Sequence, residues 1–253
     1  MPDTTPVPNG FKLDCADTET AESGRRLPRA LETCHSRPVS TDPDTMAVLV
    51  PSADAFPIAI PVLALVASAG GLNALIRVLA PLPADLSAAV LVVQHQNPDR
   101  PSNSLADILD ARTALQVRAA RDGDRLQPGH VLVTPPATHM IVTPTSALAL
   151  IDSGRLPPSR PSADLLLATL AVTCGPRALA VVLTGHGHDA QAGIRAVHRC
   201  GGLVLAQDEA TAEAFGMPAA AIATGLVHAV VPLSELPGLI IRQLRDSARK
   251  TVS

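Results

Sequence analysis

The chain has 253 residues, of which 47% are hydrophobic and 17% charged, and its formal net charge at pH 7 is -3. This much apolar material supports a sizeable core, so we expect a globular protein with one large domain or two small ones. With three Phe, no Trp and no Tyr, the chain lacks the aromatic platforms and the positive charge that single-stranded nucleic acid requires, and no nucleic-acid partner is expected.

The cysteine pattern and the terminus bear on the cellular compartment. Cys15, Cys34, Cys174 and Cys200 form no CxxC pair, which indicates neither a disulfide framework nor a zinc site. The N-terminus shows no signal sequence, and the longest apolar run, residues 56–67, is too short and too interrupted by Pro to span a bilayer. These features predict a cytoplasmic protein without membrane insertion.

The chain divides into a tail and a domain. Residues 1–57 are rich in Pro, Thr, Ser, Asp and Glu without apolar periodicity and are predicted to be a disordered N-terminal tail, with Met46 as an alternative start. Residues 58–247 are predicted to form the folded domain, and 248–253 a C-terminal tail.

Within the domain, short apolar runs alternate with longer helix-like runs, the pattern of βαβ units around a mostly parallel sheet. The expected strands are 62–67, 88–94, 178–184, 203–207 and 226–231. The expected helices are 72–82, one near 102–110, 162–173 capped by Ser162, 189–199, 218–224 with Pro218 in its first turn, and one from about 234. Residues 129–151 contain Pro-rich turns and are predicted to be a hairpin excursion.

Polar residues follow three of these strands. Ser68 follows the first, His95 the second, and a loop with His186, His188 and Asp189 follows strand 178–184. Carboxyl ends of parallel strands share one edge of a sheet, and a hydroxyl, an imidazole and a carboxylate brought together there form a nucleophile, its base and the group that orients the base. Spacing alone leaves open that Ser68 is only a turn or cap residue.

Two other site types compete with this reading. The pair Gly70-Gly71 before a helix would suit a phosphate, but the G-x-G-x-x-G spacing and a following Lys are missing, so a dinucleotide site is disfavoured. A metal site made by His186, His188 and Asp189 with His95 stays open, as does a reading of the loop histidines as solvated groups. Four further histidines are expected to be structural or on the surface: His130, His139, His198 and His228.

Six blocks in order carry a family resemblance: VASAGGLNAL, VVQHQNP, AARDGDRLQPGHVLVTPPATHM, RPSADLLLATLA, VVLTGHGHDAQAGI and AQDEATAEAFGMPAAAIATG. Over roughly residues 60–243 the sequence resembles the catalytic domain of the chemotaxis protein-glutamate methylesterases, CheB. The resemblance implies a three-layer, doubly wound α/β fold with about seven strands and a small antiparallel hairpin. It also implies that no metal or organic cofactor is needed.

The resemblance assigns the nucleophile to Ser68, the base to His95 and the orienting carboxylate to Asp189. It implies hydrolysis of glutamate methyl esters on cytoplasmic chemoreceptor-type helices with release of methanol, and in some members deamidation of receptor glutamines. On this reading, the backbone N–H groups of Ala69 and His186 form the oxyanion site. Gly70 and Gly71 either let a receptor helix approach the nucleophile or merely permit the turn.

The sequence departs from the family pattern at four positions around this site. Ala69 replaces the usual Thr or Ser, His186 a Met, His188 an Asn or Ser, and Ala190 a Gly, which bears on substrate specificity. The receiver domain that commonly precedes this domain is not expected in about 57 residues, since such a unit needs about 100. The expected partner is a methylated chemoreceptor or a receptor-like coiled coil, and the alternatives are a non-catalytic receptor-docking module and a metal-dependent hydrolase.

Overall fold

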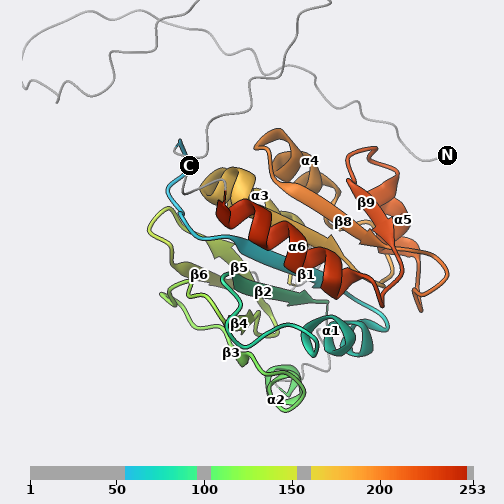
Figure 1. The fold of residues 1–253 in the computed structure, drawn as a ribbon, viewed down its shortest axis with the longest axis horizontal. Coiled ribbons are helices and arrows are strands. Elements are labelled where there is room, and N and C mark those ends of the chain that lie inside the picture. The colour runs from blue at the N-terminus through green and yellow to red at the C-terminus, as the bar shows by residue number, and fades with distance from the viewer. Residues whose placement is uncertain (1–54, 96–103, 153–160, 250–253) are drawn as a thin grey trace, which may run out of the picture. The chain divides into compact units, whose positions relative to one another are not determined.

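The centre of the fold is a seven-stranded, wholly parallel sheet (Figure 1). In the order β3-β4-β2-β1-β7-β8-β9, its strands are Gln116–Ala119, His130–Val133, Ala89–Gln94, Val62–Ala67, Ala178–Val182, Leu203–Gln207 and Ala229–Val231. Two further strands, β5 (Thr138–Val142) and β6 (Leu148–Asp152), form a separate antiparallel pair. The computed structural model describes residues 55–95, 104–152 and 161–249, all within one compact unit, Val48–Ser253.

Helices cover both faces of the sheet. One face packs on α1 (Gly71–Leu79), α2 (Leu105–Asp110) and α6 (Leu236–Arg249). The other packs on α3 (Ala163–Cys174), α4 (Gln191–Arg199) and α5 (Gly216–Ile222), with a 3-10 turn, η2 (Gly175–Arg177), after α3. All six residues of β1 are buried because their side chains alternate between the two cores, and a strand covered on both faces must be apolar throughout. The predicted three-layer α/β fold is confirmed.

The prediction for residues 129–151 was wrong in its first part. β4 belongs to the main sheet, where it pairs in parallel with β2 and β3, and only β5 and β6 form the expected hairpin. Pro135 and Pro136 follow β4 after Thr134 and suggested a turn between two hairpin strands, whereas β4 is an internal strand of the main sheet. The sequence prediction also missed β3, an edge strand with one buried residue, Val117.

Several element boundaries moved by a few residues. α1 ends at Leu79 instead of 82, and the strand expected over 226–231 is confined to β9. α6 runs to Arg249, past the predicted domain boundary at 247. The predicted disordered tail, apart from residues 55–57, lies outside the described residues.

Within the described ranges, no helix is both long enough and apolar enough to cross a membrane. The longest, α6, has 14 residues, fewer than the roughly 20 that a bilayer core requires.

Helices α3 and α4 approach each other closely at Gly193. A Cβ added there would overlap the Cβ of Leu167 and lie 3.3 Å from the Asp164 Cα. Leu167 is fully buried, so neither helix can give way without opening the core. The glycine is therefore required by packing and not by its backbone conformation.

Replacing Gly193 by Ala should destabilise the protein by about 1–3 kcal/mol, because the added methyl group forces the two helices apart. Gly238→Ala in α6 is the matched control, since its new Cβ would meet only Arg242 Nη1, at 3.7 Å. That change should stabilise by roughly 0.5–1 kcal/mol through helix propensity. Urea unfolding of both variants measures the difference, and equal stabilities would contradict this account of the α3–α4 contact.

Candidate active site

The candidate site lies beyond the carboxyl ends of β2, β1 and β7, where the strand order reverses. This switch point is where open parallel sheets bind ligands. The strand pairing continues into the site, since Ser68 N donates to Thr184 O at 3.0 Å and His95 N donates to Ala67 O at 2.9 Å. Ser68 therefore leaves the central strand, with His95 on one side and the loop that carries Asp189 on the other.

Asp189 and His95 are joined by a hydrogen bond. His95 Nε2 lies 2.9 Å from Asp189 Oδ2, and the two side chains are only 13% and 6% exposed. Because the carboxylate accepts a hydrogen bond from Nε2, that nitrogen carries the proton and the lone pair of the imidazole is left on Nδ1. His95 thereby acquires one fixed tautomer with a basic nitrogen directed away from Asp189.

The Asp189 carboxylate sits at the N-terminus of α3. Its Oδ2 accepts from Ala163 N at 2.7 Å, and its Oδ1 accepts from Asp164 N at 3.1 Å and from Ser162 Oγ at 3.4 Å. Burial acts to raise the pKa of Asp189, but the hydrogen bonds from His95, Ala163 and Asp164 outweigh it and lower that pKa. Asp189 is thus held in the ionised form that a base-orienting carboxylate needs.

The cap is reciprocal between the two helices. Asp164, in the first turn of α3, accepts from Gly193 N of α4 at 2.8 Å through Oδ1. Burial, followed by the nearby charge of Asp189, raises the pKa of Asp164 despite this hydrogen bond. Asp189, which precedes α4, thus accepts hydrogen bonds from α3, and Asp164 of α3 accepts one from α4. These contacts in both directions fix the loop between β7 and α4.

The turn after Ser68 is held by two contacts to its carbonyl. Ser68 O accepts from Gly71 N at 2.9 Å and from Gln94 Nε2 at 2.6 Å. Gly70 has φ +74°, a conformation that favours glycine, and a Cβ on Gly71 would overlap the Gln94 amide. The backbone conformation thus favours glycine at position 70, and packing against Gln94 requires it at position 71. The role of both glycines in substrate approach stays a prediction.

The two backbone N–H groups predicted as oxyanion donors, Ala69 N and His186 N, make no internal hydrogen bond in the described part of the chain. A Cβ on Gly185 would lie 2.6 Å from Ser68 Cβ, so the peptide that carries His186 N follows a residue in contact with the serine. Thr184 Oγ1 donates to Ala69 O at 2.9 Å and holds the facing peptide. Both predicted oxyanion donors are thus unused in the described structure, and their role stays a prediction.

The structure does not join every candidate residue. In the described part of the chain, Ser68 Oγ makes no hydrogen bond to the His95 ring. His186 and His188 are exposed, and no three or more His, Cys, Asp or Glu among the described residues are arranged to hold a metal ion. Because both oxygens of Asp189 are directed to α3 and His95, this arrangement does not favour the metal hypothesis.

Ala190 has an unusual backbone conformation next to Asp189. Its φ of +99° is rare for a residue with a Cβ. This explains why α4 begins at Gln191 and not at 189 as predicted, and it agrees with the glycine that the resembling family carries at this position.

Sequence reasoning missed two polar supports. Ser162 was predicted as a helix cap, and its Oγ does accept from Leu165 N at 3.4 Å, but it also reaches Asp189. His139, expected to be structural, is buried, and its Nδ1 accepts from Ser162 N at 3.0 Å. A histidine inside an apolar strand was the available signal, but its partner lies 23 residues away and nothing in the sequence pairs them.

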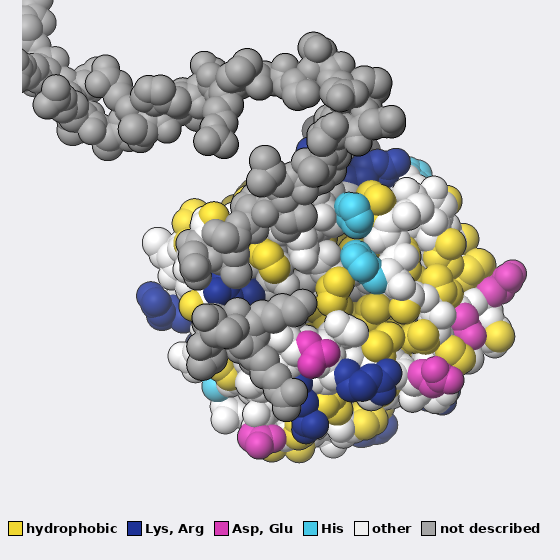
Figure 2. All heavy atoms as spheres, turned by 45° about the horizontal axis from the view of Figure 1, so that its top comes forward, with side chains coloured by type: hydrophobic (Ala, Val, Ile, Leu, Met, Phe, Trp, Pro, Cys, Tyr) yellow, Lys and Arg dark blue, Asp and Glu magenta, His cyan; other side chains and the backbone are white. Residues whose placement is uncertain are grey.

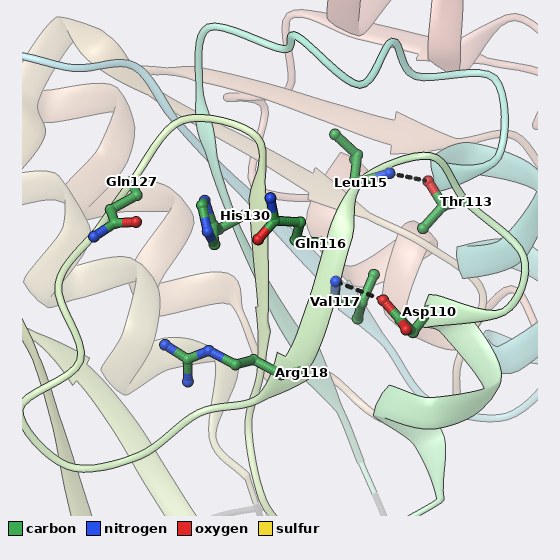
Figure 3. A pocket seen from close by; sticks show the side chains of 8 residues that line it. All are labelled: Asp110, Thr113, Leu115, Gln116, Val117, Arg118, Gln127 and His130. Atoms are coloured by element: carbon green, nitrogen blue, oxygen red, sulfur yellow. Dashed lines mark hydrogen bonds between the residues drawn. The ribbon is translucent and has the colours of Figure 1, made fainter.

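A cavity of about 440 Å³ lies elsewhere, between α2, β3 and the start of β4 (Figure 3). His130 and Gln116 line it and open their strands, so it borders the amino ends, opposite the candidate site. Its polar groups serve the fold, since Asp110 Oδ1 accepts from Val117 N at 3.0 Å and Arg118 pairs with Asp124. On the face in Figure 2, side chains of both charges lie among hydrophobic and uncharged ones.

Replacing Asp189 by Asn should lower stability by about 1–3 kcal/mol at pH 7, because a neutral amide cannot accept all the N–H groups that point at the carboxylate. A lowered folded-state pKa contributes stability above the unfolded-state pKa, about 3.9, and loses it as the pH falls through the folded value. The difference in free energy of unfolding between the native protein and the variant should therefore shrink below about pH 4. Urea unfolding between pH 7 and pH 3 measures it.

Asp85→Asn is the control for that series. Asp85 is exposed, and within the described ranges it makes no hydrogen bond or ion pair, so its replacement should change stability by less than about 0.5 kcal/mol at every pH. A gap for Asp189→Asn that is equally small would contradict the capping role of the carboxylate.

The comparisons with known proteins agree with this geometry. The CheB methylesterase family model matches residues 63–240. A protein-glutamate methylesterase/protein-glutamine glutaminase of Bordetella bronchiseptica is 43% identical over 188 residues, which cover 73% of this chain and 53% of that protein. A protein of the same description from Myxococcus xanthus, numbered 1, is 45% identical over 178 residues, covering 69% of this chain and 51% of that one.

This chain thus spans about half the length of the curated relatives it matches. The crystal structure of the Thermotoga maritima CheB methylesterase catalytic domain aligns with a TM-score of 0.69 at 31% identity, covering 73% of this chain and 99% of that domain. The match therefore takes in almost all of that catalytic domain. By sequence and by structure, the chain belongs to the CheB methylesterase family.

Proposed function

We propose that this protein is a cytoplasmic serine esterase that hydrolyses methyl esters of glutamate side chains on chemoreceptor-type helices. The observation that carries the proposal is the His95–Asp189 hydrogen bond of 2.9 Å beside Ser68 at the switch point of the sheet. Its support from the family is the description of the relatives as protein-glutamate methylesterases. The partner is a methylated receptor or a receptor-like coiled coil.

The mechanism follows from the fixed tautomer of His95. Its Nδ1 takes the proton of Ser68 Oγ as that oxygen attacks the ester carbonyl carbon, and Asp189 stabilises the imidazolium that forms. When the tetrahedral intermediate collapses, the same proton passes to the methoxide, which leaves as methanol. Water then attacks the carbonyl carbon of the acyl-serine while Nδ1 takes one of its protons. When the second tetrahedral intermediate collapses, that proton passes to Ser68 Oγ, and the glutamate leaves as a free acid.

The negative charge that develops on the carbonyl oxygen needs donors already in place. Ala69 N and His186 N supply them, since neither is used elsewhere in the described structure and both peptides adjoin Ser68. Donors of this kind contribute about 3–4 kcal/mol to the transition state. Thr184 supports the arrangement because it fixes Ala69 O from the opposite loop.

The same groups would deamidate a glutamine side chain. An amide in place of the ester loses ammonia instead of methanol from the tetrahedral intermediate, and His95 again supplies the proton. The relatives carry this second activity in their description as protein-glutamine glutaminases. We therefore include receptor glutamines in the proposed substrate class.

Ser68→Ala should reduce methanol release from a methylated receptor by at least about 10³-fold, because triad nucleophiles contribute that much or more. The native protein should also be labelled at Ser68 by a fluorophosphonate, read by mass spectrometry. The control is Ser87→Ala, since Ser87 is exposed between α1 and β2 and its loss should change neither readout.

The outcomes separate the proposal from its rivals. A native protein that binds receptor but shows neither turnover nor labelling is a docking module. Activity that a chelator abolishes, with stoichiometric metal in the purified protein, supports the metal-dependent hydrolase instead. Methanol release that persists in Ser68→Ala would rule out the serine mechanism.

His95→Ala should abolish turnover to the same extent as Ser68→Ala, whereas His186→Ala should retain activity within about tenfold. The reason is that Asp189 orients only His95, while the exposed His186 ring has no hydrogen-bond partner in the described part of the chain. Its proposed contribution comes from the backbone N–H, which alanine keeps. Rates of methanol release decide between the two bases, and a larger loss in the His186 variant would assign the base to that residue.

A further inference from the structure

Gln94 is the last residue of β2 and precedes the proposed base. We propose that Gln94 is a positioning residue whose side-chain amide holds the turn of the nucleophile against the strand of the base. The inference rests on the proposed function, because it concerns the same site, but its first observation is purely structural. One amide group hydrogen-bonds to the backbone of both Ser68 and His95 and, in the described part of the chain, makes no hydrogen bond to the reacting side chain of either.

The contacts of the amide nitrogen define the role. Gln94 Nε2 donates to Ser68 O at 2.6 Å and to His95 O at 3.3 Å. The backbone of Ser68 is thereby fixed at both ends, because its N–H donates to Thr184 O and its carbonyl also accepts from Gly71 N. Only the side chain of Ser68 remains free to rotate toward its substrate.

The orientation of the amide is settled by its surroundings. A flipped Gln94 would place its carbonyl oxygen against Ser68 O, and two acceptors at hydrogen-bonding distance repel each other. The nitrogen therefore faces the serine. The oxygen Oε1 then lies against Gly71, where any side chain would collide with it.

Oε1 is buried and finds no hydrogen-bond donor in the described part of the chain. A buried acceptor without a donor destabilises a fold, and native proteins keep few of them. An apolar residue of the same length would avoid this cost but would also lose the two hydrogen bonds of Nε2, so the glutamine keeps these two bonds at the cost of one unpaired buried acceptor. Polar groups retained against stability are typical of functional sites.

We call the two hydrogen bonds from Gln94 Nε2 to Ser68 O and His95 O the clamp. The clamp acts on the rate of the chemical step. Since the amide contacts neither Ser68 Oγ nor the His95 ring among its hydrogen bonds, its loss leaves the reacting groups in place but lets the turn move relative to the base. Displacements of about 1 Å at a reacting group cost on the order of 10²-fold in rate. A positioning role thus predicts a loss in kcat with little change in KM.

Gln94→Met removes both donors and the unpaired oxygen while keeping the length of the side chain. Its kcat for methanol release should fall about 10- to 100-fold at unchanged KM. Its midpoint of thermal unfolding should fall no further than that of the control variant below, because removal of the unpaired oxygen offsets part of the loss of the two hydrogen bonds. Thr134→Val is the matched control, because Thr134 Oγ1 donates to Val92 O at 2.9 Å, a side-chain bond to the same strand but away from the triad. That variant should lose thermal stability and keep its kcat.

Gln94→Glu adds a readout that a merely structural role would not move. The ionised carboxylate would face Ser68 O and repel it, whereas the protonated acid can donate one hydrogen bond to the same oxygen. Burial next to carbonyl oxygens raises the pKa of the introduced carboxyl above its usual value of about 4.3. The ratio of variant to native activity should therefore be highest at the acid end and fall as the pH rises.

Amide hydrogen exchange tests the clamp without relying on turnover. In Gln94→Met, the N–H groups of Ser68 and Gly71 should exchange faster than in the native protein, and in Thr134→Val they should not. Unchanged exchange, an unchanged kcat, or an activity ratio of Gln94→Glu that is flat with pH would each overturn the inference. A native protein that neither releases methanol nor is labelled at Ser68 refutes the proposed function instead, and the exchange rates still decide on the clamp.

Discussion

The rest of the structure depends on one carboxylate placed at the end of one helix. Asp189 accepts from Ala163 N and Asp164 N at the start of α3 and binds His95 through the same group. A carboxylate at a helix N-terminus meets unpaired N–H groups and the positive end of the helix dipole, which together offset the cost of burying a charge. The charge that orients the imidazole is thus stabilised by backbone N–H groups at the start of α3.

This constraint ties the site to the helices behind it. The carboxylate of Asp164 accepts a hydrogen bond from Gly193 N of α4. The loop between β7 and α4 is therefore bound to α3 through Asp189, and α4 itself is bound to α3 through Asp164. The absence of a side chain at Gly193 permits the close approach of α3 and α4. Ser162 fixes the start of α3, because its N–H donates to His139 Nδ1 and its hydroxyl to Asp189 Oδ1. The position of Asp189 at the sheet edge therefore depends on how α3 and α4 pack in the core.

Much of the fold could be predicted, and the limits are instructive. The apolar runs that became β1, β2, β7 and β8 are buried on both faces, so the sequence alone marks them. β3 escaped prediction because an edge strand needs few apolar residues, and β4 was assigned to a hairpin because local turn signals cannot say which strand is the partner. The position of Asp189 near Ser68 was expected from the strand ends, whereas its cap on α3 joins residues more than 20 positions apart.

The layers of the fold, the family and the three polar residues that follow the strands can be read from the sequence, because burial periodicity and motif order are local properties of the chain. Tertiary structure alone decided which nitrogen of His95 faces the carboxylate, why Gly71 must leave room for the Gln94 amide, and which N–H groups remain free around Ser68. These depend on distances between segments that the chain brings together only on folding, since hydrogen bonds act over about 3 Å whatever the separation in sequence.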